Sequence, residues 1–247
     1  MNMKKTFILT ISAFLVTASA FAWSKKTEGQ ANLGRTYISI EGGAQFNKFV
    51  DPAGKHTPTD GVAGIAFNVP VFKPGVNALK DVSWIGLDAQ AFFGLAGGDV
   101  IDGVDFLNYK AGIALVPYLN FETGWSFIQA IKPFAYGRVG YEWMNFSGEN
   151  NTAEDENYVF YGFGGGVEIV ATSSLSLTGQ WNWYGNAQSG MPCSNSVSGE
   201  LTYWLNGMFA TAIFAEHNFG ANYDDYNSVD FKHGTTIGLR FKIGFNR

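Results

Sequence analysis

The sequence predicts an all-β protein, a single closed antiparallel β-barrel that spans a membrane. Three observations predict it: a composition rich in glycine and aromatic residues, apolar side chains at every second position, and connections that alternate between long loops and short turns. The 247 residues include 31 Gly, 22 Phe, 11 Tyr and 7 Trp, where average usage would give about 17 glycines at roughly 7%. With 46% hydrophobic residues and one cysteine, neither disorder nor a disulfide scaffold is expected.

The first 22 residues have the features of a cleaved signal peptide. Lys4 and Lys5 form a basic start, an apolar run follows from Phe7 to Val16, and Ala20-Phe21-Ala22 is a small-x-small cleavage site. The run is shorter than the roughly 20 residues that a membrane helix needs. We therefore predict a signal peptide over 1–22, a polar N-terminal leader over 23–34, and one barrel domain over 35–247.

Strand periodicity runs through the rest of the chain. Between 104 and 121, for example, Leu107, Tyr109 and Ala111 alternate with Asn108 and Lys110. Ten strands are predicted, over 35–47, 61–71, 82–95, 104–121, 133–146, 157–171, 175–185, 197–205, 208–219 and 233–246. Eight strands is the alternative, because the hairpin over 197–219 alternates poorly.

Alternation alone fits a soluble exported sandwich as well as a membrane barrel. Two features favour the barrel. Tyr141, Trp143, Trp181 and Trp183 lie near strand ends on the apolar face, where aromatic residues anchor a membrane protein at the lipid interface. The polar face also carries both signs of charge together with glycines, which suits a lumen.

The connections have two lengths. Long polar loops are predicted over 48–60, 97–103, 147–157, 185–196 and 220–232, and tight turns over 172–174 and at Asn206-Gly207, a strong hairpin signal. Long loops at one end and short turns at the other are typical of outer-membrane barrels, and an even strand number brings both chain ends to the same side.

These features resemble a known family. The signal peptide, the glycine-rich first strand Tyr37-Ile38-Ser39-Ile40-Glu41-Gly42-Gly43 and the closing strand Leu239-x-Phe241-x-Ile243-x-Phe245 are similar to the small Gram-negative outer-membrane β-barrels of the OmpA/OmpX/OmpW-like group. The terminal strand of that family usually ends on the aromatic residue, whereas Asn246 and Arg247 follow here. The resemblance implies an outer-membrane location, contact with outer-membrane lipids and insertion by the assembly machinery of that membrane.

By parity, a set of charged residues should face the lumen. They are Glu41, Asp88, Lys110, Arg138, Glu142, Glu168, Glu200, Arg240 and Lys242. Opposite charges in so narrow a space should pair, since unpaired ions at low dielectric are costly. We expect the pairs to plug the lumen. The alternative is that they line a narrow porin-like channel for small solutes or ions.

The sequence gives weaker evidence for a catalytic site than for a barrel with a charged lumen. An acidic and histidine cluster at the outer rim, formed by His217, Asp224, Asp225 and His233, is the best candidate for an enzyme site. His56 has only the acids of its own loop nearby, and the acidic segment from Glu149 to Glu156 matches no calcium loop. We expect no catalytic residue, no metal ligand and no cofactor, and we assign no role to Cys193.

Charge also limits the partners. Cleavage removes two of the 16 basic residues, so 14 remain against 21 acidic ones, a net charge of −7. Nucleic acid is therefore not an expected partner. The sequence predicts a structural or surface-interaction protein with outward loops and an unknown ligand or solute. Small substitutions on the lumen face, such as Gly112→Ser, are expected to be mild.

Overall fold

The computed structural model describes residues 32–51, 54–74, 84–101, 104–147, 156–172, 174–187, 193–220 and 230–245. Ten long strands form the wall: β1 (Thr36–Asp51), β3 (Thr59–Phe72), β4 (Ile85–Ile101), β5 (Val104–Leu119), β7 (Ala130–Ser147), β8 (Glu156–Val170), β9 (Leu175–Asn186), β10 (Ser194–Trp204), β11 (Phe209–Asn218) and β12 (Asp230–Phe245). Two short strands, β2 (Gly54–His56) and β6 (Phe121–Glu122), extend hairpins at the two ends. Among the described residues no helix is long and apolar enough to span a membrane.

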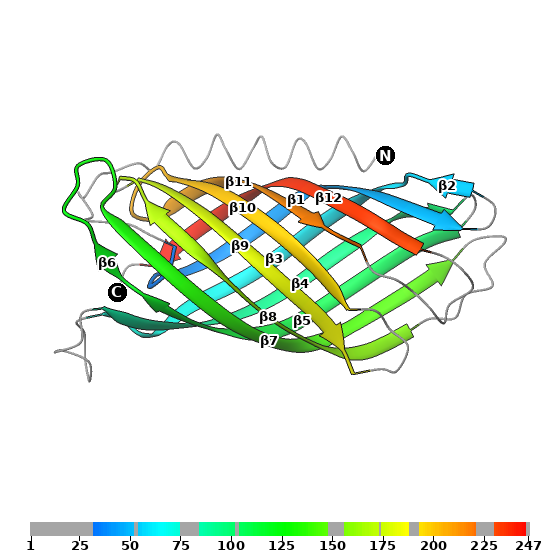
Figure 1. Cartoon of the computed structure of the whole chain (residues 1–247), viewed down its shortest axis with the longest axis horizontal. Coiled ribbons are helices and arrows are strands. Elements are labelled where there is room, and N and C mark those ends of the chain that lie inside the picture. The colour runs from blue at the N-terminus through cyan, green and yellow to red at the C-terminus, as the bar shows by residue number, and fades with distance from the viewer. Residues whose placement is uncertain are drawn as a thin grey trace.

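Each long strand pairs antiparallel with the next, and β12 pairs with β1, so the sheet closes into a barrel (Figure 1). The closing register runs from Thr36 opposite Phe245 to Val50 opposite Asp230. The prediction of a ten-stranded closed barrel is confirmed, and the eight-stranded alternative is wrong, because residues 194–218 form a regular hairpin. The soluble sandwich is also wrong, since a sandwich consists of two separate sheets.

The two ends of the barrel differ. We call the end where β1 begins and β12 ends the terminal end, and the opposite one the loop end (Figure 1, left and right). At the terminal end, β8–β9 and β10–β11 are joined over 171–174 and 205–208. Two loop predictions at the loop end are wrong. Most of 97–103 is strand, and β4 and β5 are joined by residues 102–103. Most of 48–60 is also strand, because β1 continues to Asp51, β2 covers Gly54–His56 and β3 begins at Thr59.

Side chains alternate between the two faces as predicted. Ile113 and Leu115 on the outer face are 61% and 54% exposed, whereas Ala114 and Val116 between them are buried. Buried residues also include many polar and charged ones, among them Asp88, Glu142 and Glu168. An apolar exterior around a polar interior is the pattern of a protein whose solvent is lipid.

Inward-facing side chains are matched in size across strands β7 and β8. Phe134, Tyr136 and Arg138 on β7 stand opposite Gly166, Gly164 and Gly162 on β8, and further along the order reverses, with Gly140 opposite Phe160. A Cβ at Gly164 would lie 2.7 Å from atoms of the Tyr136 ring. The side chains of Tyr136, Arg138 and Phe160 therefore lie close over the glycine that faces each of them.

Gly112 is also confined by atoms of neighbouring strands. The expectation that Gly112→Ser is mild is therefore wrong. A Cβ at this position would lie 2.6 Å from the carbonyl oxygen of Val139 and 2.8 Å from Cζ of Phe92. The lumen face is polar at this level, but it is not roomy. A serine side chain here must displace the Phe92 ring or the neighbouring backbone.

Candidate functional site in the barrel lumen

The terminal end of the lumen is occupied by the chain itself. Before β1 begins, residues 32–34 turn into the barrel, and their backbone amides bind two carboxylates on opposite parts of the wall. Asn32 N and Leu33 N donate to the two carboxylate oxygens of Glu168 at 2.7 and 3.1 Å, and Gly34 N donates to Asp88 Oδ2 at 2.9 Å. We call residues 32–35 the N-terminal plug.

Side chains of the plug reach further strands. Asn32 is buried and donates from Nδ2 to Ser176 Oγ at 3.3 Å and Thr202 Oγ1 at 3.2 Å. The guanidinium of Arg35 stacks over the Trp204 ring, 3.8 Å from its centroid, and burial lowers the pKa of Arg35 to about 10. The plug therefore contacts strands on several sides of the lumen.

Sequence reasoning did not find every group at this level. Lys132 also faces inward, opposite Glu168, and its Nζ donates to the carbonyl oxygen of Leu33 at 3.1 Å. Asn68 holds Asp88 through a 2.9 Å hydrogen bond. Lys132 precedes Pro133 outside the predicted strand, and its inward parity could have identified it had the strand been started earlier.

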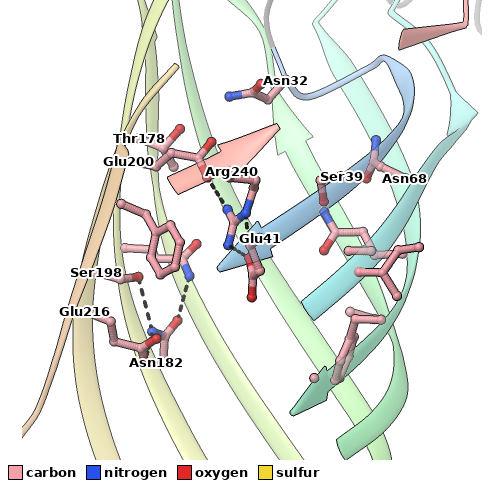
Figure 2. Close-up of a pocket in the computed structure, with 18 of the residues that line it drawn as sticks. Asn32, Ser39, Glu41, Asn68, Thr178, Asn182, Ser198, Glu200, Glu216 and Arg240 are labelled. Carbon is pink, nitrogen blue, oxygen red and sulfur yellow. Dashed lines mark hydrogen bonds and ion pairs between the residues drawn. The ribbon is translucent and has the colours of Figure 1, made fainter. Parts of the chain in front are cut away.

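A charged cluster lies next to the plug on the side of the wall formed by β10, β11, β12 and β1. Arg240 donates hydrogen bonds to Glu200 and Glu41 (Figure 2). Glu200 also accepts a hydrogen bond from Lys242. Lys242 in turn donates to Asn32 Oδ1 at 2.9 Å, which joins the cluster to the plug. These four charges come from β1, β10 and β12, and each has a partner of opposite sign.

A second ion pair lies nearer the loop end. Lys110 Nζ lies 2.9 Å from Glu142 Oε1, and Glu142 also accepts hydrogen bonds from Asn108 at 2.5 Å and from the Tyr184 hydroxyl. Of the nine charges predicted to face the lumen, the structure places all nine on the inner face. Eight of them bind another charge or the plug amides, and the ninth, Arg138, has no such partner among the described residues.

Between these groups lies a cavity of about 480 Å³. Figure 2 shows Asn32 on one side of it, Arg240 and Glu41 near its centre, and Asn182, Ser198 and Glu216 toward the loop end. On the β3 and β4 side the wall residues include Ala66, Gly94 and Ala96. The hollow exists because these residues are small while polar side chains fill the opposite wall.

Exposure is uneven along the lumen. The side chain of Lys110 is 41% exposed, whereas that of its partner Glu142 is 3% exposed. Arg240 is 27% and Lys242 2% exposed, and Glu168 and Thr202 at the plug are fully buried. The plug and the charged cluster therefore occupy the terminal half of the lumen, and Lys110 is an exposed charge toward the loop end.

The histidines of the predicted rim site do not face the lumen. His217 and His233 share the parity of the exposed residues Ile213 and Ile237, which places both rings on the outer face, 5.8 Å apart. Nδ1 of His217 is hydrogen-bonded to Thr235 at 2.9 Å. Asp224 and Asp225 lie outside the described residues. Within the described ranges, no group of three or more His, Cys, Asp or Glu side chains is placed to hold a metal ion.

The four predicted interface aromatics lie on the outer face toward the loop end. Tyr141 and Trp143 contact each other with ring centroids 4.7 Å apart, and Trp181 and Trp183 both contact Phe163, at 5.8 and 4.9 Å. A second set of exposed aromatic residues lies toward the terminal end and comprises Trp84, Trp125 and Tyr203. Their positions fit two membrane interfaces with an apolar band between them.

Comparison with known proteins shows the fold. No protein-family model and no curated protein sequence matches the chain. The transport unit of the autotransporter AIDA-I from Escherichia coli matches with a TM-score of 0.54 and 11% identity, over 96% of this chain and 97% of that one. An outer membrane channel from Pseudomonas putida F1 gives a TM-score of 0.45 and 10% identity over 90% and 100% of the two chains. Neisserial surface protein A gives 0.37 and 11% over 84% and 97%.

At such identities the likeness shows the architecture and leaves the activity open. The closed sheet, the apolar outer face with aromatic residues toward both ends, and the polar interior are what strands require to cross a membrane. They also support the outer-membrane location that the sequence predicts. The chain is a closed ten-stranded antiparallel β-barrel with an apolar outer face, and it shares this fold with the transport unit of the AIDA-I autotransporter.

Proposed function

We propose that this protein is a plugged outer-membrane barrel that presents its loop end at the cell surface as a structural or surface-interaction element. The observation that carries the proposal is the N-terminal plug. Three consecutive backbone amides are bound by the fully buried carboxylates of Glu168 and Asp88. Charge-assisted hydrogen bonds of this kind are about twice as strong as neutral ones.

The charged cluster supports the same proposal. Glu200, Arg240 and Lys242 form a connected set of ion pairs directly beside the plug, and Lys242 also donates to Asn32 of the plug. Breaking a buried pair by removing one partner costs about 3–5 kcal/mol. The cluster therefore helps to hold the plug in the terminal half of the lumen.

The cavity of about 480 Å³, which extends from Asn32 of the plug to Glu216 toward the loop end, favours a second candidate, the narrow channel. A channel needs a continuous polar path, and the cavity supplies half of one. The proposal includes no catalytic role. Insertion would use the assembly machinery of the outer membrane, as the resemblance to small outer-membrane barrels implies.

Single-channel recording in a planar bilayer tests the proposal. The protein is first shown to be folded by the heat-dependent shift in gel mobility that stable barrels give. Folded wild-type protein should show no steady, salt-proportional openings. Steady openings would contradict the plugged barrel and support the channel, and replacement of Lys110 or Arg240 should then change the ion selectivity.

A further inference from the structure

We propose that the loop half of the lumen holds a binding site for a small hydroxylated carboxylate of the sugar-acid type, with Arg138 as its anion-binding residue. The site goes beyond the proposed function, since a plugged barrel does not require it. Its starting point is the imbalance in pairing: Lys110, Arg240 and Lys242 each bind a carboxylate, while Arg138 forms no ion pair or hydrogen bond with any described residue. A guanidinium in a confined space calls for a counter-anion.

The Arg138 side chain is held in place without an ionic partner. Its Nε is buried and has no hydrogen-bond partner in the described part of the chain. The side chain lies over Gly162, where a Cβ would approach Nε to 2.9 Å, and its guanidinium carbon lies 5.7 and 5.8 Å from the ring centroids of Tyr136 and Tyr184. The aromatic contacts fix the guanidinium beside the cavity that it lines. A fixed guanidinium is suited to bidentate binding of a planar carboxylate.

The groups next to Arg138 are suited to hydroxyls. The Tyr136 hydroxyl donates to Asn182 Oδ1 at 2.5 Å, and Gln180 Nε2 donates to the same oxygen at 3.0 Å. Nδ2 of Asn182 lies 3.4 Å from Ser198 Oγ and 3.5 Å from Glu216 Oε1. Asn182 itself is buried, and its Nδ2 also donates to Ser196 Oγ at 2.9 Å. The residues around it that line the cavity, Tyr136, Gln180, Ser198 and Glu216, carry both donors and acceptors, which a polyhydroxylated ligand can use and a simple anion cannot.

Charge and size narrow the ligand further. Glu216 forms no ion pair with a described residue and accepts a 2.5 Å hydrogen bond from Ser196. Its negative charge beside Arg138 disfavours a second anionic group on the ligand, so a monoanion fits better than a dianion. The cavity of about 480 Å³ is within the range of roughly 300–1,000 Å³ that small-molecule sites occupy.

In the part of the chain that the structure describes, the loop end is the side from which a ligand would enter. Lys110, which also lines the cavity, is 41% exposed, whereas the plug closes the terminal end. The ligand would therefore come from the loop end. Binding at Arg138 does not depend on whether the lumen conducts ions. A failure of the binding test would therefore count against this site alone, and a failure of the conductance test would count against the plugged barrel alone.

Calorimetric titration of the folded, detergent-solubilised protein with glucuronate tests the site. Glucuronate should bind saturably with one site per chain. Glucose, which has the hydroxyls without the carboxylate, and acetate, which has the carboxylate without the hydroxyls, should each bind at least tenfold more weakly. Arg138→Gln should weaken glucuronate binding at least tenfold, and Arg138→Lys, which keeps the charge but loses the planar fork, should lie between.

Lys55→Gln is the matched control, because Lys55 is an exposed cation of β2 that does not line the cavity. Its affinity for glucuronate should stay within twofold of wild type. Each variant must first show the heat-dependent mobility shift of a folded barrel. Absence of saturable binding by the folded wild type, or wild-type affinity in Arg138→Gln, would overturn the proposal. Inorganic phosphate binding as tightly as glucuronate would reveal a general anion site and overturn the assignment to a hydroxylated carboxylate.

Discussion

At the scale of single residues, the interior depends on glycines that face large side chains on the next strand. A Cβ at Gly140 would approach the Phe160 ring to 2.5 Å, and one at Gly238 would approach the Phe214 ring to 2.7 Å. Protein interiors are close-packed, so such positions cannot accept even one methyl group without movement. The high glycine content thus has a steric reason in addition to any conformational one.

Gly112 and Gly94 separate this steric role from the general effect of replacing glycine. Both face the lumen on neighbouring strands, but a Cβ at Gly94 meets nothing within 4 Å, whereas one at Gly112 meets Val139 O and Phe92. Gly112→Ala should therefore cost about 1–3 kcal/mol of overpacking. Gly94→Ala should be neutral or stabilise by up to about 1 kcal/mol through a less flexible unfolded chain. Urea unfolding of the protein in lipid vesicles measures both, and equal effects would mean that space at these glycines does not limit packing.

At the scale of elements, the N-terminal plug is an irregular segment held by wall carboxylates. Glu168 presents both oxygens, one to Asn32 N and one to Leu33 N. Glu168→Gln keeps the shape of the side chain but replaces one acceptor with an amide group, which faces a backbone donor and cannot accept its hydrogen bond. We expect backbone amides 32–34 to exchange with deuterium at least tenfold faster in this variant, measured by mass spectrometry of the N-terminal peptide.

Glu142→Gln is the control for that exchange experiment. Glu142 is also a buried carboxylate, but it binds Lys110, Asn108 and Tyr184 toward the loop end and forms no hydrogen bond or ion pair with the described residues of the plug. It should leave the exchange of amides 32–34 unchanged. Equal protection of these amides in wild type and Glu168→Gln would show that the plug is held by other contacts.

The regular strands are predictable from sequence because successive side chains of a strand point to opposite faces of the sheet. Once the apolar residues are seen at every second position, the lipid-facing and the lumen-facing side chains are both assigned. The segment 97–103 was mistaken for a loop because glycine and aspartate are depleted in strands. The structure supplies the reason for a glycine there: a Cβ at Gly98 would lie 2.3 Å from Asp60 Oδ1. The neighbour that requires this glycine belongs to another strand, and strand periodicity does not reveal it.

At the scale of the whole molecule, parity predicted which charges face the lumen but not how they pair. Asp88 and Glu168 are bound by backbone amides of the plug, which a count of charged side chains cannot include. Arg138 was counted as one cation among four, although three are paired and it is not. Which charged side chains pair depends on their positions along the barrel axis. These positions follow from the register between strands and from the tilt of the strands, and the sequence pattern of a single strand fixes neither.

The closure of the lumen at one end can be tested along a single strand. Ser198 and Thr202 both face inward on β10, but Ser198 lines the cavity, whereas Thr202 is fully buried beside Asn32. In a Cys193→Ser background, which removes the exposed native thiol, Ser198→Cys should react with a small membrane-impermeant maleimide on intact cells at least tenfold faster than Thr202→Cys. Equal, fast labelling would mean an open pore and would contradict the plug. Labelling of Ser198→Cys only after the outer membrane is made permeable would place the loop end on the periplasmic side and contradict display of that end at the cell surface.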